Sequence, residues 1–313
     1  MVLGASALGG ACQPARRMAV ATRVWVGYET LYLARDRGWL DPTQVELVSA
    51  NGSADSLQAL RSNRVQAAGL TLDEALLAHA GGVPLSILMV FDISLGADML
   101  VAQPHVRDLG DLRGRQIGYE TGSVGELMLT EALRAAGLRR SDVRLLQVPV
   151  IGQAAAWRAR VVDALITFEP MATRLLAMGA RRLFDSRQIP DTIVDVLAVR
   201  QDALGWSQRS VWQHVIEGHF RAVEHLTLNP HDAAQRMATH LELPASQVLS
   251  AYRGLALPDL AQNRRLLSGP TPRLLESARK VAAVLSETGS LVPSQSWTGL
   301  IRDDFLPTGG RTP

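Results

Sequence analysis

Residues 115–126 read Arg115-Gln-Ile-Gly-Tyr-Glu-Thr-Gly-Ser-Val-Gly-Glu126. This pattern predicts a short buried strand that ends at Thr121, followed by a helix that begins near Ser123. Ser123 suits the N-cap position, and Glu126 three residues later completes a capping box. The first turn of a helix has N–H groups without intrahelical partners and a partial positive charge, so this turn suits a negative or polar ligand group. The same pattern also fits an ordinary capped helix start.

Apolar segments typical of strands alternate with segments typical of helices on both sides of this stretch. Other predicted strands are residues 22–27, 44–49, 66–70, 85–91, 100–102, 143–149, 162–167, 182–184 and 193–199. Short Gly- and Ser-containing loops join them, so we expect an α/β fold with a parallel or mixed sheet covered by helices on both sides. Residues 13–21 read as a linker, and helices predominate after Arg200. In such sheets ligands bind beyond the carboxyl ends of the strands.

The composition is that of a globular protein of one large or two medium domains. The chain has 313 residues, of which 47% are hydrophobic and 20% charged, so wholesale disorder is excluded. The 32 basic and 30 acidic residues nearly balance, giving a formal net charge of +2. No cluster of basic residues with interleaved aromatics is present, so we expect no nucleic-acid partner.

Cys12 is the only cysteine of the chain, which excludes an intramolecular disulfide and a cysteine-based metal site. It follows a run of small and apolar residues that resembles the end of a secretory signal with a lipobox. The run departs from that pattern at Gly9, where a branched apolar residue is usual, and it lacks a basic segment. We expect a lipid anchor on Cys12 as the only membrane attachment, with an incidental N-terminal cysteine as the alternative. No later stretch approaches the roughly 18 apolar residues that a membrane-spanning helix needs.

Six segments together resemble the substrate-binding proteins of ABC importers in the nitrate, sulfonate and taurine group. They are Leu31-Tyr-Leu-Ala-Arg35, Leu70-Thr-Leu-Asp-Glu-Ala75, Ser94-Leu-Gly-Ala-Asp98, Asp111-Leu-Arg-Gly-Arg-Gln-Ile-Gly118, Val162-Asp-Ala-Leu-Ile-Thr-Phe-Glu-Pro170 and Leu183-Phe-Asp-Ser-Arg-Gln-Ile-Pro190. The similarity covers about residues 22–306. It leaves the solute open, because this group also includes proteins that bind pyrimidine precursors of thiamine.

The resemblance implies a type II periplasmic-binding-protein fold, with two lobes joined by two hinge strands near residues 100–102 and 199–200. Residues 22–100 and 200–313 would form the first lobe, residues 101–199 the second, and residues 1–21 a signal-like start and linker. The resemblance further implies a monomer in the periplasm or at the cell surface, without a cofactor. Its partners would be a small-molecule solute and an ABC permease with its ATPase subunits.

Closing two lobes on a solute replaces its water with fixed polar groups of the protein, so each lobe should present such groups at the edge of the cleft. The candidates from the first lobe are Tyr28, Ser53, Thr71, Asp92, Ser94 and Asp98. Those from the second lobe are Glu120, Thr121, Ser123 and Glu169. The helix starts at Ser53 and Ser123 suit a sulfonate, carboxylate or nitrate oxygen.

The acidic candidates favour a different ligand group. Asp98, Glu120 and Glu169 follow strands and would repel a small anion, and we identify no histidine or arginine in these loops that would neutralise them. This balance favours a ligand with an amine or several N–H donors over simple nitrate or sulfate. An aminosulfonate, another zwitterion or an aminopyrimidine would fit.

Other residues have simpler alternative roles. Asp73 and Glu74 suit the first turn of a helix, where they complement its dipole. Asp92 could instead cap a turn. Trp25 reads as a core residue and Trp157 as packing, whereas Tyr28, just past a strand, is the aromatic residue we expect over the ligand.

Signatures of catalysis are missing from the sequence. There is no Gly-x-Ser-x-Gly elbow and no P-loop, and His214 and His219 are five positions apart, so they do not share a helical face as i, i+4 metal ligands would. We therefore expect no metal, no cofactor and no enzyme activity. A cytoplasmic two-lobed ligand sensor or enzyme is the alternative, since such folds also host transferases.

Overall fold

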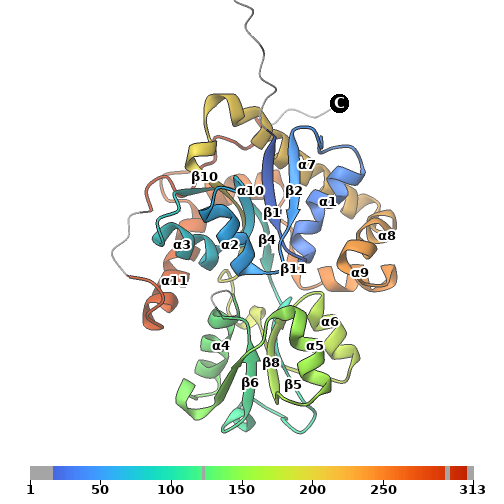
Figure 1. Cartoon of the computed structure of the whole chain (residues 1–313), viewed down its shortest axis with the longest axis vertical. Coiled ribbons are helices and arrows are strands. Elements are labelled where there is room, and N and C mark those ends of the chain that lie inside the picture. Colours follow the sequence, from blue (N-terminus) through green and yellow to red (C-terminus); the bar gives the residue numbers. More distant parts are fainter. Residues whose placement is uncertain (1–16, 122–123, 293–296, 309–313) are drawn as a thin grey trace, which may run out of the picture.

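The chain folds into two lobes, each built on one β-sheet (Figure 1). The computed structural model describes residues 17–121, 124–292 and 297–308, so the predicted sites at Cys12 and Ser123 lie outside the described residues. Strands and helices alternate through both lobes, as the sequence predicts, and helices predominate in the C-terminal third.

The first lobe contains a six-stranded sheet in the order β11–β4–β10–β3–β1–β2. Its strands are β1 (Met18–Thr22), β2 (Val45–Ser49), β3 (Ala67–Thr71), β4 (Leu85–Ser94), β10 (Val194–Arg200) and β11 (Leu255–Ala256). Its helices are α1 (Glu29–Asp36), α2 (Ser53–Arg61), α3 (Leu72–Ala80), α7 (Arg209–Leu228), α8 (Pro230–Leu241), α9 (Ala245–Tyr252), α10 (Leu260–Leu267) and α11 (Arg273–Glu287). Because α7 packs against α1 and α11 against α3, helices from both ends of the chain cover this sheet.

The second lobe contains a five-stranded sheet in the order β7–β6–β8–β5–β9. Its strands are β5 (Asp98–Ala102), β6 (Gln116–Tyr119), β7 (Arg144–Gln147), β8 (Ala164–Phe168) and β9 (Arg181–Asp185), and its helices are α4 (Val124–Ala135), α5 (Val150–Arg158) and α6 (Met171–Ala177). Every residue of β8 is buried, which explains its nearly continuous apolar sequence. Trp157 is buried in the apolar core of this lobe, so its predicted packing role is confirmed.

The chain crosses between the lobes at residues 95–97, from β4 to β5, and at residues 186–193, from β9 to β10. The hinges expected near residues 100–102 and 199–200 are therefore wrong. β5 pairs with β8 and β9 in the second sheet, and β10 pairs with β3 and β4 in the first. An apolar segment predicts a strand, but it does not tell which sheet the strand joins, because that depends on partners distant in sequence.

The first strand also differs from the prediction. β1 spans Met18–Thr22, within the segment expected to be a linker, and the predicted strand at residues 22–27 is wrong. The chain instead leaves the sheet at Arg23 and forms a short 3₁₀ helix, η1 (Val26–Tyr28). β1 is buried on both faces, so its residues do not alternate between apolar and polar. The alternating residues from Arg23 to Trp25 belong to a loop between β1 and η1 and not to a strand.

No helix in the described part of the chain is long and apolar enough to cross a membrane.

Candidate functional site

A cavity of about 250 Å³ lies between the two lobes. The first lobe lines it with Arg23, Val24, Ser49, Ala50, Asn51, Gly52 and Glu242, and the second with Val150, Ile151, Phe168, Pro170, Met171 and Arg174. A recess of about 10 Å³ shares Arg23 and Phe168 with this cavity, so the two adjoin. The recess is further lined by Trp25, Thr71, Asp98, Val124 and Asp195.

Three polar side chains form a row across the first sheet beside this recess. Asp195 on β10 pairs in register with Thr71 on β3 and with Asp92 on β4. The Trp25 indole Nε1 donates to Asp92 Oδ2 at 3.0 Å, and the Tyr28 hydroxyl donates to Asp195 Oδ1. We did not predict Asp195. The signal that could have identified it is a single acid within the apolar segment Val194-Asp-Val-Leu-Ala-Val199.

Burial makes these carboxyl groups weak acids. It raises the pKa of Asp98 to about 7 and that of Asp92 to about 8. The pKa of Asp195 is raised well above its ordinary value, first by burial and then by the neighbouring Asp92. Two carboxyl groups side by side in a buried site resist ionising together, so a cationic partner would stabilise the ionised forms of Asp92 and Asp195.

Arg23 supplies a positive charge in the cavity. It lies outside the loops in which we identify no arginine, but it offsets the charges of Asp98 and Glu120, so the inference that nothing neutralises these acids is wrong. The Arg23 side chain is buried, and its Nη1 donates to Glu74 Oε2 at 2.8 Å. We overlooked it because we placed it inside a strand. A second arginine, Arg174, lines the outer cavity and donates through Nη2 to the carbonyl of Glu242 at 2.8 Å, across the two lobes. The site therefore carries both signs of charge.

Several buried polar atoms, two of them on residues that line the recess, have no hydrogen-bond partner among the described residues. They are Ser53 Oγ, Thr71 Oγ1, Asp73 Oδ2, Glu74 Oε1, Asp92 Oδ1, Asp98 Oδ2 and Thr167 Oγ1. Buried polar atoms in folded proteins are nearly always hydrogen-bonded, so such a group calls for a missing partner. Once ionised, a carboxylate oxygen only accepts hydrogen bonds, so a cationic partner rich in donors would both satisfy these atoms and favour the ionised form.

The sequence profile of the NMT1-like family matches residues 12–242 of the 313. The chain belongs to the NMT1-like family. Among curated relatives, this NMT1-like chain is 22% identical over 261 residues to the taurine-binding periplasmic protein of Escherichia coli K12, covering 78% of this chain and 81% of that protein. It is also 28% identical over 75 residues to a protein of Brucella abortus named only as a binding protein, and this match spans 24% of each chain.

Solved structures confirm the two-lobed fold of periplasmic binding proteins. The alkanesulfonate-binding protein SsuA from Xanthomonas axonopodis pv. citri, bound to MOPS, superposes with a TM-score of 0.76 at 19% identity and covers 90% of this chain and 96% of its own. Together with the family profile and the taurine-binding relative, this confirms the expected resemblance to the nitrate, sulfonate and taurine group. The desulfurization enzyme DSZB superposes with a TM-score of 0.69 at 17% identity, covering 93% and 98%, so this fold also carries enzymes.

The structure brings some of the predicted residues of this NMT1-like chain to the cavity. Thr71 and Asp98 line the recess, and Asp92 lies beside Asp195, which also lines it. Glu120, from the second lobe, approaches the start of α2 in the first: a Cβ added at Gly52 would lie 3.0 Å from Glu120 Oε1. Ser53 begins α2 and is buried.

Other predicted residues lie elsewhere. Tyr28 is wholly buried, donates to Asp195 and packs edge-on against Phe91, and it lines neither the cavity nor the recess. Thr121 is exposed. Glu169 is buried and its Oε2 accepts a hydrogen bond from the Thr173 amide at 3.0 Å. Ser94 is bonded at the crossing between the lobes.

Asp73 and Glu74 lie in the first turn of α3, as predicted, and Glu74 accepts a hydrogen bond from the Thr71 amide. No set of three His, Cys, Asp or Glu side chains in the described ranges could hold a metal ion.

Proposed function

We propose that this chain is the solute-binding component of an ABC importer of the sulfonate, taurine and nitrate type, and that it captures a small zwitterion. The observation that carries the proposal is a group of buried carboxylate oxygens near Arg23 that have no hydrogen-bond partner within the described ranges, one of them on Asp98 in the recess. Family membership supports the role as a binding protein, and the charges support the class of solute. At about 250 Å³ the cavity suits a ligand smaller than the usual occupant of a binding pocket.

The amine end of the solute would enter the recess. Asp98 and Asp195 provide carboxyl groups there, and the Trp25 and Phe168 rings meet edge to face with centroids 5.7 Å apart. An ammonium group gains from both carboxylates and aromatic faces, especially where water is excluded. It would also offset the repulsion between Asp92 and Asp195.

The anionic end would lie toward Arg23 and the start of α2. Only one N–H group of the Arg23 guanidinium is used in the bond to Glu74, and a guanidinium offers five. The N-cap residue of α2, Gly52, lines the cavity and provides no capping side chain. The turn at Thr121 and Ser123, which we first expected to hold this end, stays a prediction.

A second solute class is an aminopyrimidine. Its ring could stack on the aromatic side chains of the recess, and its amino groups would donate to the unpartnered acceptors. It lacks an anionic group and would leave the free N–H groups of Arg23 unused. We therefore rank it second. An enzyme of the same fold would convert the bound solute, which a turnover assay tests directly, whereas a cytoplasmic ligand sensor would carry no lipid on Cys12.

Isothermal titration with taurine, ethanesulfonate and ethylamine tests the proposal, because the last two each lack one end of the first. Taurine should bind most tightly. Asp98→Asn, beside Phe168 at the end of β8, should weaken taurine binding by more than about 1 kcal/mol and affect ethanesulfonate less. Asp163→Asn, at the opposite end of β8, is the matched control. Equal affinity for taurine and ethanesulfonate would contradict the role of the carboxyl groups.

The remaining parts of the proposal concern location and partners. We infer that the protein acts as a monomer in the periplasm or at the cell surface, anchored by a lipid on Cys12, and delivers its solute to a permease with ATPase subunits. Mass spectrometry of the membrane fraction should show a diacylglyceryl adduct on Cys12. An unmodified Cys12 in that fraction would rule the anchor out.

A further inference from the structure

Asp92 lies on the face of the first sheet that regular alternation along β4 would not give it. In a regular strand, side chains two positions apart share a face, so Asp92 would point to the same side as Val90. The observed register is different, because Asp92 pairs with Asp195 and Val90 pairs with Val196. Asp195 and Val196 are consecutive on β10 and therefore point to opposite faces. Phe91 is thus an extra residue in β4, a β-bulge that turns Asp92 away from the Val90 side.

The bulge decides which neighbours the Asp92 carboxyl meets. Val90 packs in an apolar core, where a carboxyl group would be buried among hydrocarbon side chains. On the opposite face, Asp92 Oδ2 accepts a hydrogen bond from Trp25 Nε1 at 3.0 Å, and it lies so close to Gly27 that a Cβ there would overlap it. Trp25 lines the recess and contacts Phe168 of the second lobe. The bulge therefore bears on the position of an indole that forms a wall of the recess.

Asn263 of α10 holds this bulge from the outer edge of β4. Its Oδ1 accepts a hydrogen bond from the Val90 amide at 2.7 Å, and its Nδ2 donates to the Val90 carbonyl at 3.1 Å. A carboxamide offers the same donor and acceptor as a peptide group, so Asn263 takes the place of a neighbouring strand here. Within the described ranges, β11 pairs with the last two residues of β4, and Ile301 bridges to β4 at Ile87. The bulge lies between these two contacts.

Asn263 is itself fixed in one orientation. The side chain is wholly buried, and its Nδ2 also donates to the Pro258 carbonyl at 3.1 Å. The start of α10 is capped, because Asp259 Oδ1 accepts a hydrogen bond from the Gln262 amide at 2.7 Å and Gln262 Oε1 accepts from the Asp259 amide at 2.8 Å. The carboxamide is therefore presented to Val90 by a rigid turn.

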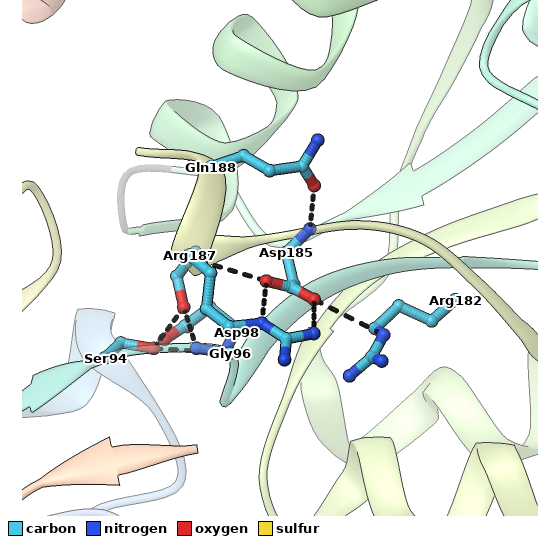
Figure 2. Close-up of polar contacts among 8 residues, drawn as sticks. Ser94, Gly96, Asp98, Arg182, Asp185, Arg187 and Gln188 are labelled. Carbon is cyan, nitrogen blue, oxygen red and sulfur yellow. Dashed lines mark hydrogen bonds and ion pairs between the residues drawn. The ribbon is translucent and has the colours of Figure 1, made fainter. Parts of the chain in front are cut away.

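The chain on the other side of Asp92 is held by different bonds (Figure 2). β4 ends at Ser94, whose Oγ lies 2.7 Å from Ser186 Oγ and accepts a hydrogen bond from the Asp98 amide at 3.2 Å. These bonds tie the end of β4 to the crossings between the lobes, and none of them involves the bulge. Asn263 therefore fixes the strand before Asp92, and the serine pair fixes it after.

We propose that Asn263 is a positioning residue that maintains the β4 bulge, and thereby directs Asp92 to Trp25 and fixes the indole wall of the recess. Its effect on solute affinity rests on the function proposed above. Asn263 lines neither the cavity nor the recess, so it acts on a solute only through these residues.

The indole N–H signal of Trp25 in a proton–nitrogen NMR spectrum of the unliganded protein tests the positioning. Asn263→Leu removes both hydrogen bonds to β4 and should move this signal towards its place in Asp92→Ala, which lacks the acceptor. Gln66→Leu is the matched control, because Gln66 is a buried amide side chain whose Oε1 accepts from the Ala19 amide in the same sheet at 3.1 Å. It should lower the free energy of unfolding as well, but it should leave the Trp25 signal in place. Asn263→Ser is the second variant, because its shorter side chain leaves room for water and costs less stability.

Taurine affinity tests the consequence for binding. Asn263→Leu should weaken taurine binding about fivefold, and Gln66→Leu less than about twofold. Because Asn263 acts through Asp92, adding Asn263→Leu to Asp92→Ala should weaken binding no further.

A Trp25 signal at the wild-type position in both Asn263 variants would overturn the proposal. An equal displacement in Gln66→Leu would also overturn it, because it would show a general loosening of the sheet. Losses of affinity that multiply in the double variant would exclude action through Asp92. If the wild type binds no zwitterion but the signal moves only in the Asn263 variants, the function proposed above fails and the positioning role stands.

Discussion

Replacing Asp92 by asparagine should make the protein more stable at neutral pH. Asp92 is wholly buried on β4, its Oδ2 accepts from Trp25 at 3.0 Å, and its Oδ1 has no partner among the described residues. Its neighbour across the strands is another acid, Asp195. Asparagine has the same shape and keeps an oxygen for the Trp25 indole, but it removes a group whose charge the site disfavours.

The magnitude follows from the ionisation of Asp92. Burial raises its pKa in the folded protein to about 8, against about 3.9 in an unfolded chain. A group whose pKa is raised by folding contributes stability that is fully present below the unfolded value and is lost as the pH rises towards the folded value. The loss is about 1.4 kcal/mol for each pH unit, or roughly 4 kcal/mol between pH 4 and pH 7.

Urea unfolding at a series of pH values measures this difference. The free energy of unfolding of the wild type should fall from pH 4 to pH 7 more steeply than that of Asp92→Asn. Asp163→Asn is the control of opposite sign: although burial acts against it, hydrogen bonds from the Gln116 amide and from His105 lower the pKa of Asp163. Asp163 should therefore stabilise the wild type more as the pH rises. Parallel curves for the wild type and Asp92→Asn would refute the argument that Asp92 resists ionisation.

Two further substitutions test the contacts around the cleft. Arg174→Ala removes the hydrogen bonds that join α6 of the second lobe to the end of α8 in the first. Bound taurine should therefore dissociate roughly threefold to tenfold faster in stopped-flow measurements, with Arg158→Ala as control. An unchanged rate would show that this contact does not hold the lobes closed on the solute. Gly254→Ala places a Cβ 2.6 Å from the backbone nitrogen of Ala97 at the first crossing, so it should lower the free energy of unfolding by about 1–3 kcal/mol. Wild-type stability of that variant would show that the crossing can move aside.

Much of the candidate site could be predicted from where polar residues follow apolar segments. Thr71 and Asp98 were found in this way, because strand ends of an α/β fold converge on the ligand. Arg23 was missed because its neighbours alternate like a strand, although the chain has already left the sheet there. Asp195 was missed because a single acid inside an apolar strand gives no local sign of its partners.

The sequence by itself determined the α/β class, the order of most strands and helices, and the resemblance to solute-binding proteins, since these depend on local patterns of apolar residues and on short motifs. Only the tertiary structure decided that β5 belongs to the second sheet and β10 to the first, and hence where the chain crosses between the lobes. The same pairing places Asp195 beside Asp92 and ties Ser186 to Ser94. These contacts join residues about a hundred positions apart, and their geometry is set by strand register and lobe packing, which no local pattern specifies.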